Sequence, residues 1–314
     1  MTSPLPFLDA EAIGSALDWV DAVEAVERAL LDGLDPASAA ERTILDVAHG
    51  QLLLMPAETA GAVGVKLASV SPTNPGRGLP RIQALYLLLD HETLAPRALM
   101  DGTALTTVRT PAVSAVAVKH LAPLDARRLV VFGSGPQAWG HVQAMRAIRP
   151  LESVVVVGRD SGRAEELAAR ISADGLTAGV GHAGAVEKAD IVVCATSARF
   201  PLFDGALLGP EACVVAVGSH EPELREVDAH AMERAATGGG VVVETVPVAL
   251  REAGDVVLAI DDGALGADDL VGIGELVQRP DRRRGVSVFK SCGMGWQDLV
   301  VAEAALDRWS AQRA

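Results

Sequence analysis

The chain has 314 residues, of which 49% are hydrophobic and 3% aromatic, and its formal net charge is −14. This length suffices for two domains with large cores, so stability does not require disulfides or a structural metal. The acidic balance argues against a nucleic-acid partner, and any anionic ligand must be bound by a local cluster of cations. The cysteines Cys194, Cys213 and Cys292 show no metal-ligand spacing, so no metal site is predicted.

Targeting and membrane signals are missing from the pattern of apolar residues. No apolar run approaches the roughly 18 residues that a membrane-spanning helix needs. The first residues, MTSPLPFLDAEAIG, lack the basic start and apolar stretch of a signal peptide. We therefore expect a cytoplasmic protein without a membrane partner.

The first third of the sequence is predicted to form a helix, three strands and a second helix. Asp18 is a plausible N-cap for the helix that starts with WVDAVEAVERALL, and Gly33 is a plausible stop. The stretches QLLLMPA, GAVGVKLASV and IQALYLLLD are short and aliphatic, which is typical of strands. The loop SPTNPGRGLP separates the last two. A helix is predicted over 103–121, because Pro123 follows it.

From about residue 122 the pattern changes to apolar strands that alternate with helices. RRLVVFG, SVVVVG, ADIVVCAT and ACVVAVGS predict strands, and PQAWGHVQAMRAI and SGRAEELAARI predict helices. Such alternation is typical of a parallel sheet covered on both faces. We predict an α/β protein with a Rossmann-type, parallel-sheet dinucleotide domain over 122–293. Residues 1–121, together with an amphipathic helix in 294–314, are predicted to form a second, α+β domain.

The stretch VVFGSGPQAWGH places two glycines between a predicted strand and a predicted helix. Gly133 permits a tight turn, and Gly135 lacks a Cβ, so a pyrophosphate can approach the backbone. The helix N-terminus offers free N–H groups to an anion. An ordinary glycine turn would look similar, but the strand–helix unit that follows favours a dinucleotide site. The predicted cofactor contacts of this loop are Gly133, Ser134, Gly135, Pro136 and Gln137.

The end of the second strand of this domain bears on which dinucleotide is bound. An acidic residue there would hydrogen-bond the ribose of NAD, whereas an arginine suits the 2′-phosphate of NADP. The sequence reads Gly158-Arg159-Asp160-Ser161. Arg159, with Ser161 as a helix cap and hydrogen-bond donor, favours NADP(H), while Asp160 keeps NAD(H) possible.

Several stretches of the sequence, in this order, resemble the ornithine cyclodeaminase/mu-crystallin family: GVKLASVSPTNPGRGLP, DGTALTTVRT, GSGPQAWGH, ATSARFPLF, GSHEPELREVD and FKSCGMGWQDL. The resemblance covers nearly the whole chain. It implies one domain that binds a nicotinamide cofactor and another that binds substrate and forms a homodimer. Thr196, Gly218 and Phe289, which lie in the last three stretches, are expected to contact the cofactor.

Three basic residues match the substrate-binding positions of the family, namely Arg42, Lys66 and Arg109. Lys66 lies in an apolar strand and Arg109 in an otherwise uncharged helix, whereas Arg42 lies in a polar segment. Burying an unpaired cation is unfavourable, and a substrate carboxylate would offset this, gripped in part by a guanidinium. The alternative is that these side chains extend to solvent from exposed faces.

Two positions depart from the cyclodeaminase pattern. His220 stands where cyclodeaminases carry an aspartate, and Leu53 stands where they carry a glutamate. Without these acidic groups we do not expect cyclodeamination, and a less charged substrate such as a cyclic imine fits better. His220 has two interpretations: a polar loop residue after a strand, or a titratable group at the carboxyl end of a parallel strand, where ligands gather.

The sequence therefore predicts an NAD(P)H-dependent reductase or dehydrogenase that converts an imino acid, a ketimine or cyclic imine carboxylate, into an L-amino acid. Lys66 or His220, or a water held by one of them, would supply the proton. Two other enzyme activities stay open, of the ornithine cyclodeaminase and alanine dehydrogenase types. A third alternative is a non-catalytic protein that binds NADPH and a carboxylate ligand, like mu-crystallin.

Overall fold

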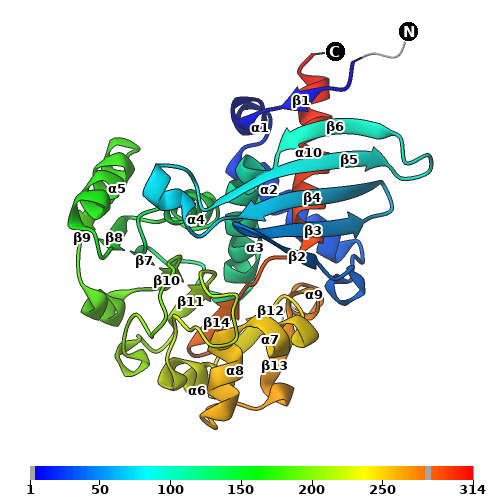
Figure 1. The fold of residues 1–314 in the computed structure, drawn as a ribbon. Helices are drawn as coiled ribbons and strands as arrows, with labels where there is room; N and C mark the ends of the chain where they lie inside the picture. The colour runs from blue at the N-terminus through cyan, green and yellow to red at the C-terminus, as the bar shows by residue number, and fades with distance from the viewer. Residues whose placement is uncertain (1–3, 280–283, 314) are drawn as a thin grey trace. The chain divides into compact units, whose positions relative to one another are not determined.

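The computed structural model describes residues 4–279 and 284–313. The chain forms two compact units (Figure 1): unit 1 comprises Met1–Arg109 and Gly293–Ala314, and unit 2 comprises Thr110–Cys292. The boundary between Arg109 and Thr110 thus falls inside a helix. The boundary predicted from the sequence lies at the end of that helix, between residues 121 and 122. The predicted domain boundaries stay a prediction about which parts fold independently.

Unit 1 is built on a mixed six-stranded sheet. The strands are β1 (Phe7–Leu8), β2 (Thr43–Val47), β3 (Gly50–Glu58), β4 (Ala62–Val70), β5 (Ile82–Asp90) and β6 (Pro96–Asp101), in the spatial order β1-β6-β5-β4-β3-β2. Of the strands described in this sheet, only β1 pairs in parallel, with β6. The sequence predicted β3, β4 and β5 correctly, whereas the two-residue β1, the exposed β2 and the partly exposed β6 were not predicted.

One face of this sheet packs against helices. The helices that lie entirely within the described part of unit 1 are α1 (Ala10–Ala16), α2 (Trp19–Leu31) and α10 (Gly295–Ala311), with 3-10 turns η1 (Pro36–Ser38) and η2 (Asn74–Arg77). Asp18 caps α2 as predicted, because its side chain accepts from the Asp21 N–H. α10 contacts α1, α2, β3, β4 and β5, so the C-terminal helix completes the core of the N-terminal part.

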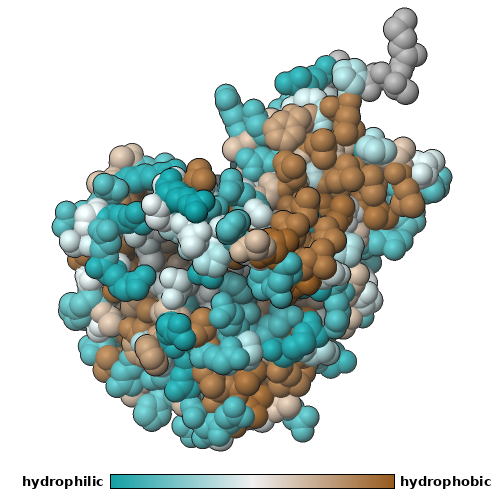
Figure 2. All heavy atoms as spheres, viewed as in Figure 1, coloured by the Kyte–Doolittle hydropathy of each residue, from teal (hydrophilic) through white to brown (hydrophobic). Residues whose placement is uncertain are grey.

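The opposite face of the sheet in unit 1 is apolar and carries none of the helices described in this unit. Strand alternation places the odd-numbered residues of β4 there, opposite matching residues of β3 and β5. Leu67 is 43% exposed and Leu85 is 50% exposed. The face is formed by Leu45, Leu52, Leu54, Val65, Leu67, Leu85 and Leu87. Figure 2 shows apolar surface gathered over this sheet.

Unit 2 contains an eight-stranded, all-parallel sheet. Its strands are β7 (Arg128–Phe132), β8 (Ser153–Val157), β9 (Thr177–Val180), β10 (Ile191–Cys194), β11 (Cys213–Ala216), β12 (Gly240–Val243), β13 (Leu270–Gly272) and β14 (Ser287–Lys290). The order is β13-β12-β14-β11-β10-β7-β8-β9. The chain therefore winds from β7 toward β8 and β9, then returns to the other side of β7 with β10. Ligands of open parallel sheets bind at such a reversal.

Helices connect these parallel strands. They are α4 (Pro136–Ile148), α5 (Ser161–Ala173), α6 (Ala229–Thr237), α7 (Val246–Glu252), α8 (Gly254–Asp261) and α9 (Ile273–Gln278), with 3-10 turns η3 (Ala183–Lys188), η4 (Gly205–Leu207) and η5 (Ala267–Asp269). All residues of β10, β11, β12 and β14 are buried. This explains why these strands are continuous apolar runs rather than alternating ones.

Helix α3 (Gly102–Leu121) contains the division between the two units. Its start is fixed by Asp101, whose carboxylate accepts hydrogen bonds from the N–H groups of Thr103 and Ala104. The helix matches the predicted range 103–121. The predicted fold class, a Rossmann-type parallel sheet with a second α+β part, is confirmed. No helix within residues 4–279 and 284–313 is long and apolar enough to cross a membrane.

Candidate functional site

Lys66 and Arg109 are buried together in unit 1, and they share an acidic partner. Lys66 is 3% exposed in the middle of β4, on the face covered by α10, and Arg109 is 7% exposed in α3. Asp298, in the first turn of α10, is fully buried. Its Oδ2 lies 2.6 Å from Lys66 Nζ, and its Oδ1 lies 3.5 Å from Arg109 Nε. The expectation of unpaired buried cations was wrong, because the chain supplies a counter-ion of its own.

The same turn of α10 provides a second, neutral acceptor. Arg109 Nη1 donates to Gln297 Oε1 at 2.7 Å, and Lys66 Nζ lies 3.4 Å from Thr106 Oγ1. Two cations against one carboxylate leave one positive charge in excess in this cluster. Because buried charge is stable only when it is paired, the excess favours binding of one further anion.

Arg42 joins this cluster through the segment that leads into α10. It lies directly before β2 and is half-buried, and its Nη2 donates to the Gly293 carbonyl at 2.9 Å. Gly293 has a φ of +82°, and a Cβ at this position would lie 2.8 Å from both Nη atoms of Arg109. Only glycine fits this contact without strain. The structure thus brings the three predicted cations together around one segment.

The environment of Lys66 adjusts its proton affinity. Burial lowers the pKa of the Lys66 ammonium to about 8, and Arg109 lowers it as well, whereas Asp298 acts in the opposite direction and raises it. The side chain is therefore mainly protonated at neutral pH. An amine of this kind can bind an anion and can also release a proton near physiological pH.

The strand positions that flank Lys66 offer no second carboxylate. The register partners of Lys66 are Met55 on β3 and Tyr86 on β5. Leu53 lies on the same face of β3 as Met55 and is half-buried. Tyr86 is fully buried, and burial raises the pKa of its hydroxyl. These side chains beside the cationic cluster are thus uncharged, which suits a substrate without a side-chain ammonium.

The glycine loop of unit 2 has the geometry that the sequence predicted. Gly133 has a φ of +112°, and a Cβ there would lie 2.4 Å from the Ala195 carbonyl oxygen. At Gly135 a Cβ would meet no atom within 4 Å, so the backbone is open to a ligand. Gly135 is also the N-cap of α4, and no side chain caps the N–H groups of this helix. The first turn of α4 therefore offers free N–H groups, such as that of Gln137, to a pyrophosphate, whereas Pro136 has no N–H and contributes only its fixed backbone angle.

The segment after β8 departs in one detail from its prediction. Asp160, not Ser161, caps α5, because its Oδ1 accepts from the Arg163 N–H at 3.1 Å. Arg159 and Ser161 are exposed at the start of this helix. Asp160 therefore already has a structural role, and Arg159 remains available for a ligand at the carboxyl end of β8.

The other predicted cofactor residues lie at the carboxyl ends of central strands. Thr196 follows β10 and Gly218 follows β11, and both donate hydrogen bonds to Glu226. His220 is exposed in the loop that follows. Phe289 lies within β14 and is fully buried, so its side chain presents no surface to a ligand. Of these, Thr196, Gly218 and His220 have surface that a ligand can reach.

The described residues contain one group with metal-ligand spacing, Asp204, Asp228 and His230. Asp228 accepts from the Ala231 and Gly205 N–H groups, and Asp204 accepts from the Ala206 N–H. Both carboxylates therefore act as helix caps and do not indicate a metal ligand set.

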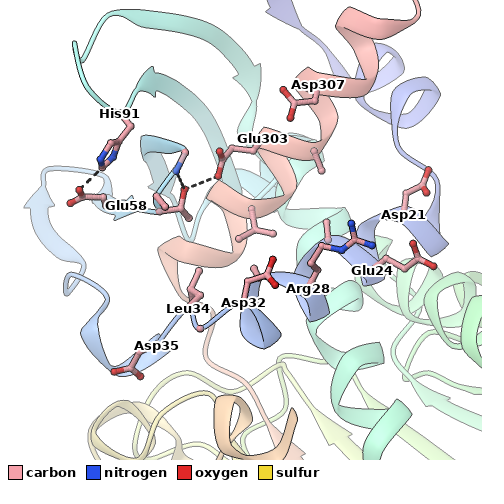
Figure 3. Close-up of a pocket in the computed structure, with 18 of the residues that line it drawn as sticks. Asp21, Glu24, Arg28, Asp32, Leu34, Asp35, Glu58, His91, Glu303 and Asp307 are labelled. Atoms are coloured by element: carbon pink, nitrogen blue, oxygen red, sulfur yellow. Dashed lines mark hydrogen bonds and ion pairs between the residues drawn. The ribbon is translucent and has the colours of Figure 1, made fainter. Parts of the chain in front are cut away.

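Unit 1 also contains a cleft of about 990 Å³ (Figure 3). Its lining contains seven carboxylates but not Arg42, Lys66 or Arg109. Three of these acidic groups have partners within the cleft: Asp21 pairs with Arg308, Glu303 accepts from Thr59, and Glu58 lies 3.6 Å from His91. The carboxylates are Asp21, Glu24, Asp32, Asp35, Glu58, Glu303 and Asp307. The cleft is thus not the predicted substrate site.

Comparison with known proteins identifies the family. The family model described as "Ornithine cyclodeaminase/mu-crystallin family" matches residues 6–313. The chain belongs to the ornithine cyclodeaminase/mu-crystallin family. Among curated proteins of this family, a Delta(1)-pyrroline-2-carboxylate reductase of Bacillus cereus is 34% identical over 275 residues, which cover 83% of each chain.

Two solved structures of the family share the fold over nearly their full length. One is the Delta(1)-pyrroline-2-carboxylate reductase of Thermococcus litoralis in complex with NADH and L-proline, with a TM-score of 0.89, 29% identity and 99% coverage of both chains. The other is an archaeal alanine dehydrogenase dimer with bound NAD, with a TM-score of 0.89, 27% identity and coverage of 99% of this chain and 97% of the other. Both of these structural neighbours thus bind NADH or NAD.

Sequence reasoning did not find Asp298, Gln297 or Glu226. Asp298 and Gln297 stand in the stretch FKSCGMGWQDL, which contributed only to the family resemblance. A signal was present: two buried cations need a buried anion, and Asp298 lies on the apolar side of an amphipathic helix. Glu226 binds mainly backbone groups, and such contacts leave no recognisable spacing in a sequence.

Proposed function

We propose that this protein is an NAD(P)H-dependent reductase of imino acids, acting on a ketimine or cyclic imine carboxylate and forming an L-amino acid. The observation that carries the proposal is the buried cluster of Lys66, Arg109 and Asp298 with one positive charge in excess. A substrate carboxylate would complete this charge balance. The similarity to a pyrroline-2-carboxylate reductase at 34% identity supports the same substrate class.

In the proposed mechanism, the protein's residues bind, orient and protonate. Arg109 and Lys66, with Arg42, hold the substrate carboxylate and thereby fix the position of the adjacent carbon–nitrogen double bond. Asp298 keeps the proton on Lys66 Nζ. Lys66 Nζ, or a water bound to it, supplies the proton that makes the imine nitrogen cationic. When bound, the reduced dinucleotide supplies the hydride to the imine carbon. His220 is a second candidate donor of this proton.

The test is a panel of cyclic imine carboxylates and of keto acid/amine pairs, with NADH and NADPH followed by absorbance. We expect reduction of at least one imino acid, and no reduction of the matching cyclic imine without a carboxylate. If dinucleotide and carboxylate bind but no imine or keto acid is turned over, the protein is a binding protein and the proposal fails. Net release of ammonia from ornithine would instead support a cyclodeaminase.

The cofactor preference is proposed to be NADPH over NADH, on the basis of the exposed Arg159 after β8. Arg159→Ala should remove most of this preference, by roughly tenfold or more in the dissociation constant for NADPH, because a charge-assisted contact to the 2′-phosphate is lost. Fluorescence titration with both cofactors measures it. Arg163→Ala, which removes a 76% exposed arginine from the same helix start, is the control. Equal affinities of the wild type for NADPH and NADH would contradict the preference.

We further propose that the protein forms a homodimer through the apolar outer face of the sheet in unit 1. Half-exposed leucines on one continuous sheet face favour association with a second copy. Leu67→Glu should give a monomer, because a carboxylate would then be buried in an apolar interface. Light scattering at micromolar concentration measures this. Leu124→Glu, at a 72% exposed site in unit 2, should leave the mass unchanged. A monomeric wild type would refute the proposal.

A further inference from the structure

A fully buried carboxylate joins two loops of unit 2. Glu226 Oε1 accepts hydrogen bonds from the Thr196 N–H at 2.8 Å and from the Thr196 hydroxyl at 2.7 Å, and Oε2 accepts from the Gly218 N–H at 2.7 Å. A Cβ on Gly218 would lie 2.0 Å from the Thr196 carbonyl oxygen. The loops after β10 and β11 therefore touch at their backbones, and Glu226 ties them together at this point.

The chain holds Glu226 itself in place through a second buried carboxylate. Asp255 Oδ1 accepts from the N–H groups of Glu226 and Val227, at 2.7 and 2.8 Å. Its Oδ2 lies 2.9 Å from Lys290 Nζ, which also donates to the Ser219 carbonyl. Burial alone would lower the pKa of Lys290, but Asp255 raises it above its ordinary value, so Lys290 stays charged. The contacts thus close a ring that begins and ends in the loop after β11.

This ring of contacts contains one more carboxylate than cation. Asp255 and Lys290 already form a balanced pair in which both side chains are fully buried. Glu226 adds a second buried carboxylate, and burial raises its pKa. A neutral side chain would avoid this electrostatic penalty, so the carboxylate is explained by its ability to accept from two loops at once.

The two tied loops lie on one side of the strand reversal. The glycine loop follows β7, and Arg159 follows β8, on the side toward β9. Thr196 and Gly218 follow β10 and β11, on the other side of β7. In such sheets a dinucleotide lies across the reversal, with its two halves over opposite sides. The half that is not bound near β7 and β8 is the nicotinamide half.

We propose that Glu226 is a positioning residue, which locks the loops after β10 and β11 into the surface that binds the nicotinamide half of the dinucleotide. The inference rests on the proposed function, because it takes the dinucleotide as the ligand of unit 2. Glu226 does not touch the ligand in this assignment. It acts through Thr196 and Gly218, and Asp255 with Lys290 fixes it from behind.

The test is the variant Glu226→Gln. Its affinity is measured for the full dinucleotide and for ADP-ribose, the part of the dinucleotide that lacks nicotinamide. Glutamine keeps an oxygen for Thr196, but its NH₂ group would face the Gly218 N–H, so the tie to that loop is lost. The Asp255–Lys290 pair remains balanced, so the fold should persist. We expect the dissociation constant for NADPH or NADH to rise at least tenfold. The constant for ADP-ribose, or for its 2′-phosphate, should change less than twofold.

Two further variants make the result specific. Gly218→Ala should also weaken dinucleotide binding selectively, because its Cβ would force the loops apart. Asp190→Asn is the control: Asp190 likewise joins two segments, by accepting from the N–H groups of Arg127 and Arg128, but at the amino ends of β7 and β10. It should lower the unfolding temperature without selectivity between the two ligands.

An equal change for dinucleotide and ADP-ribose in Glu226→Gln, or no change in either, would overturn the positioning role. Failure of the wild type to bind any dinucleotide would instead contradict the proposed function. Thermal unfolding of each variant, recorded in parallel, shows that the protein measured is folded.

Discussion

Replacing Lys66 or Arg109 by alanine is expected to lower kcat/KM for the imino acid roughly 100-fold or more, while the affinity for the dinucleotide hardly changes. Each substitution removes a buried charge that would otherwise face the substrate carboxylate. The glycine loop and Arg159 belong to unit 2 and are not altered. Steady-state kinetics with the acid and a fluorescence titration with the dinucleotide measure the two effects.

The amide of the same substrate, which has no carboxylate, separates loss of carboxylate binding from general damage to the fold. The wild type should reduce the amide poorly. Lys66→Ala or Arg109→Ala should lower its reduction little further, because the amide has no carboxylate for these cations to bind. Damage to the fold would impair both substrates alike. Arg97→Ala, which removes a half-buried arginine 3.6 Å from Asp307, is the matched control and should keep full activity. Folded variants that reduce the acid at near wild-type rates would refute carboxylate binding by Lys66 and Arg109, and with it the proposed substrate class.

Replacing Asp298 by asparagine is expected to move the alkaline limb of the pH profile to lower pH. The carboxylate raises the pKa of Lys66 against the effect of burial, so its removal lowers a pKa that is already about 8. Lys66 then loses its charge, and with it its hold on the substrate, as the pH rises through a lower value than in the wild type. The quantity measured is kcat/KM from pH 6 to 10 at constant ionic strength.

The same substitution should also destabilise the protein, by about 3–5 kcal/mol, because it leaves two buried cations without their counter-ion. Denaturant unfolding measures this loss, and added substrate or product acid should restore part of it. Asp307→Asn is the control, since Asp307 lies on the same helix with a 73% exposed side chain. An unshifted alkaline limb in a folded Asp298→Asn variant would show that Lys66 does not depend on Asp298.

The parts of the fold that sequence reasoning predicted are those with strong local patterns. The apolar runs of β7, β8, β10 and β11 indicated the parallel sheet, and the two glycines after β7 indicated the turn, which is realised with Gly133 at positive φ. Lys66 and Arg109 were found because the family resemblance marked their positions, and their place inside apolar elements supported the choice.

The parts that were not predicted depend on contacts between distant segments. Lys66 and Asp298 are 232 residues apart in the sequence, and no local pattern pairs them. The buried position of Phe289 depends on the strands that flank β14, β11 and β12, which no local pattern identifies. Asp160 and Ser161 are adjacent and both suit a cap, so the choice between them required the backbone geometry.

The return of the chain to unit 1 has a consequence for biosynthesis. Lys66 and Arg109 leave the ribosome long before Asp298, and at about 5–20 residues per second their counter-ion follows roughly 10–50 s later. The segment of unit 2, Thr110–Cys292, is uninterrupted, but its strand β14 lies between β12 and β11 and is made only just before Asp298, so unit 2 is also completed late. Lys66 in the sheet and Arg109 in α3 cannot be buried with their counter-ion before α10 emerges. A ribosome that stops before residue 298 therefore leaves a chain with an exposed, unfinished sheet, a clear target for chaperones and proteases.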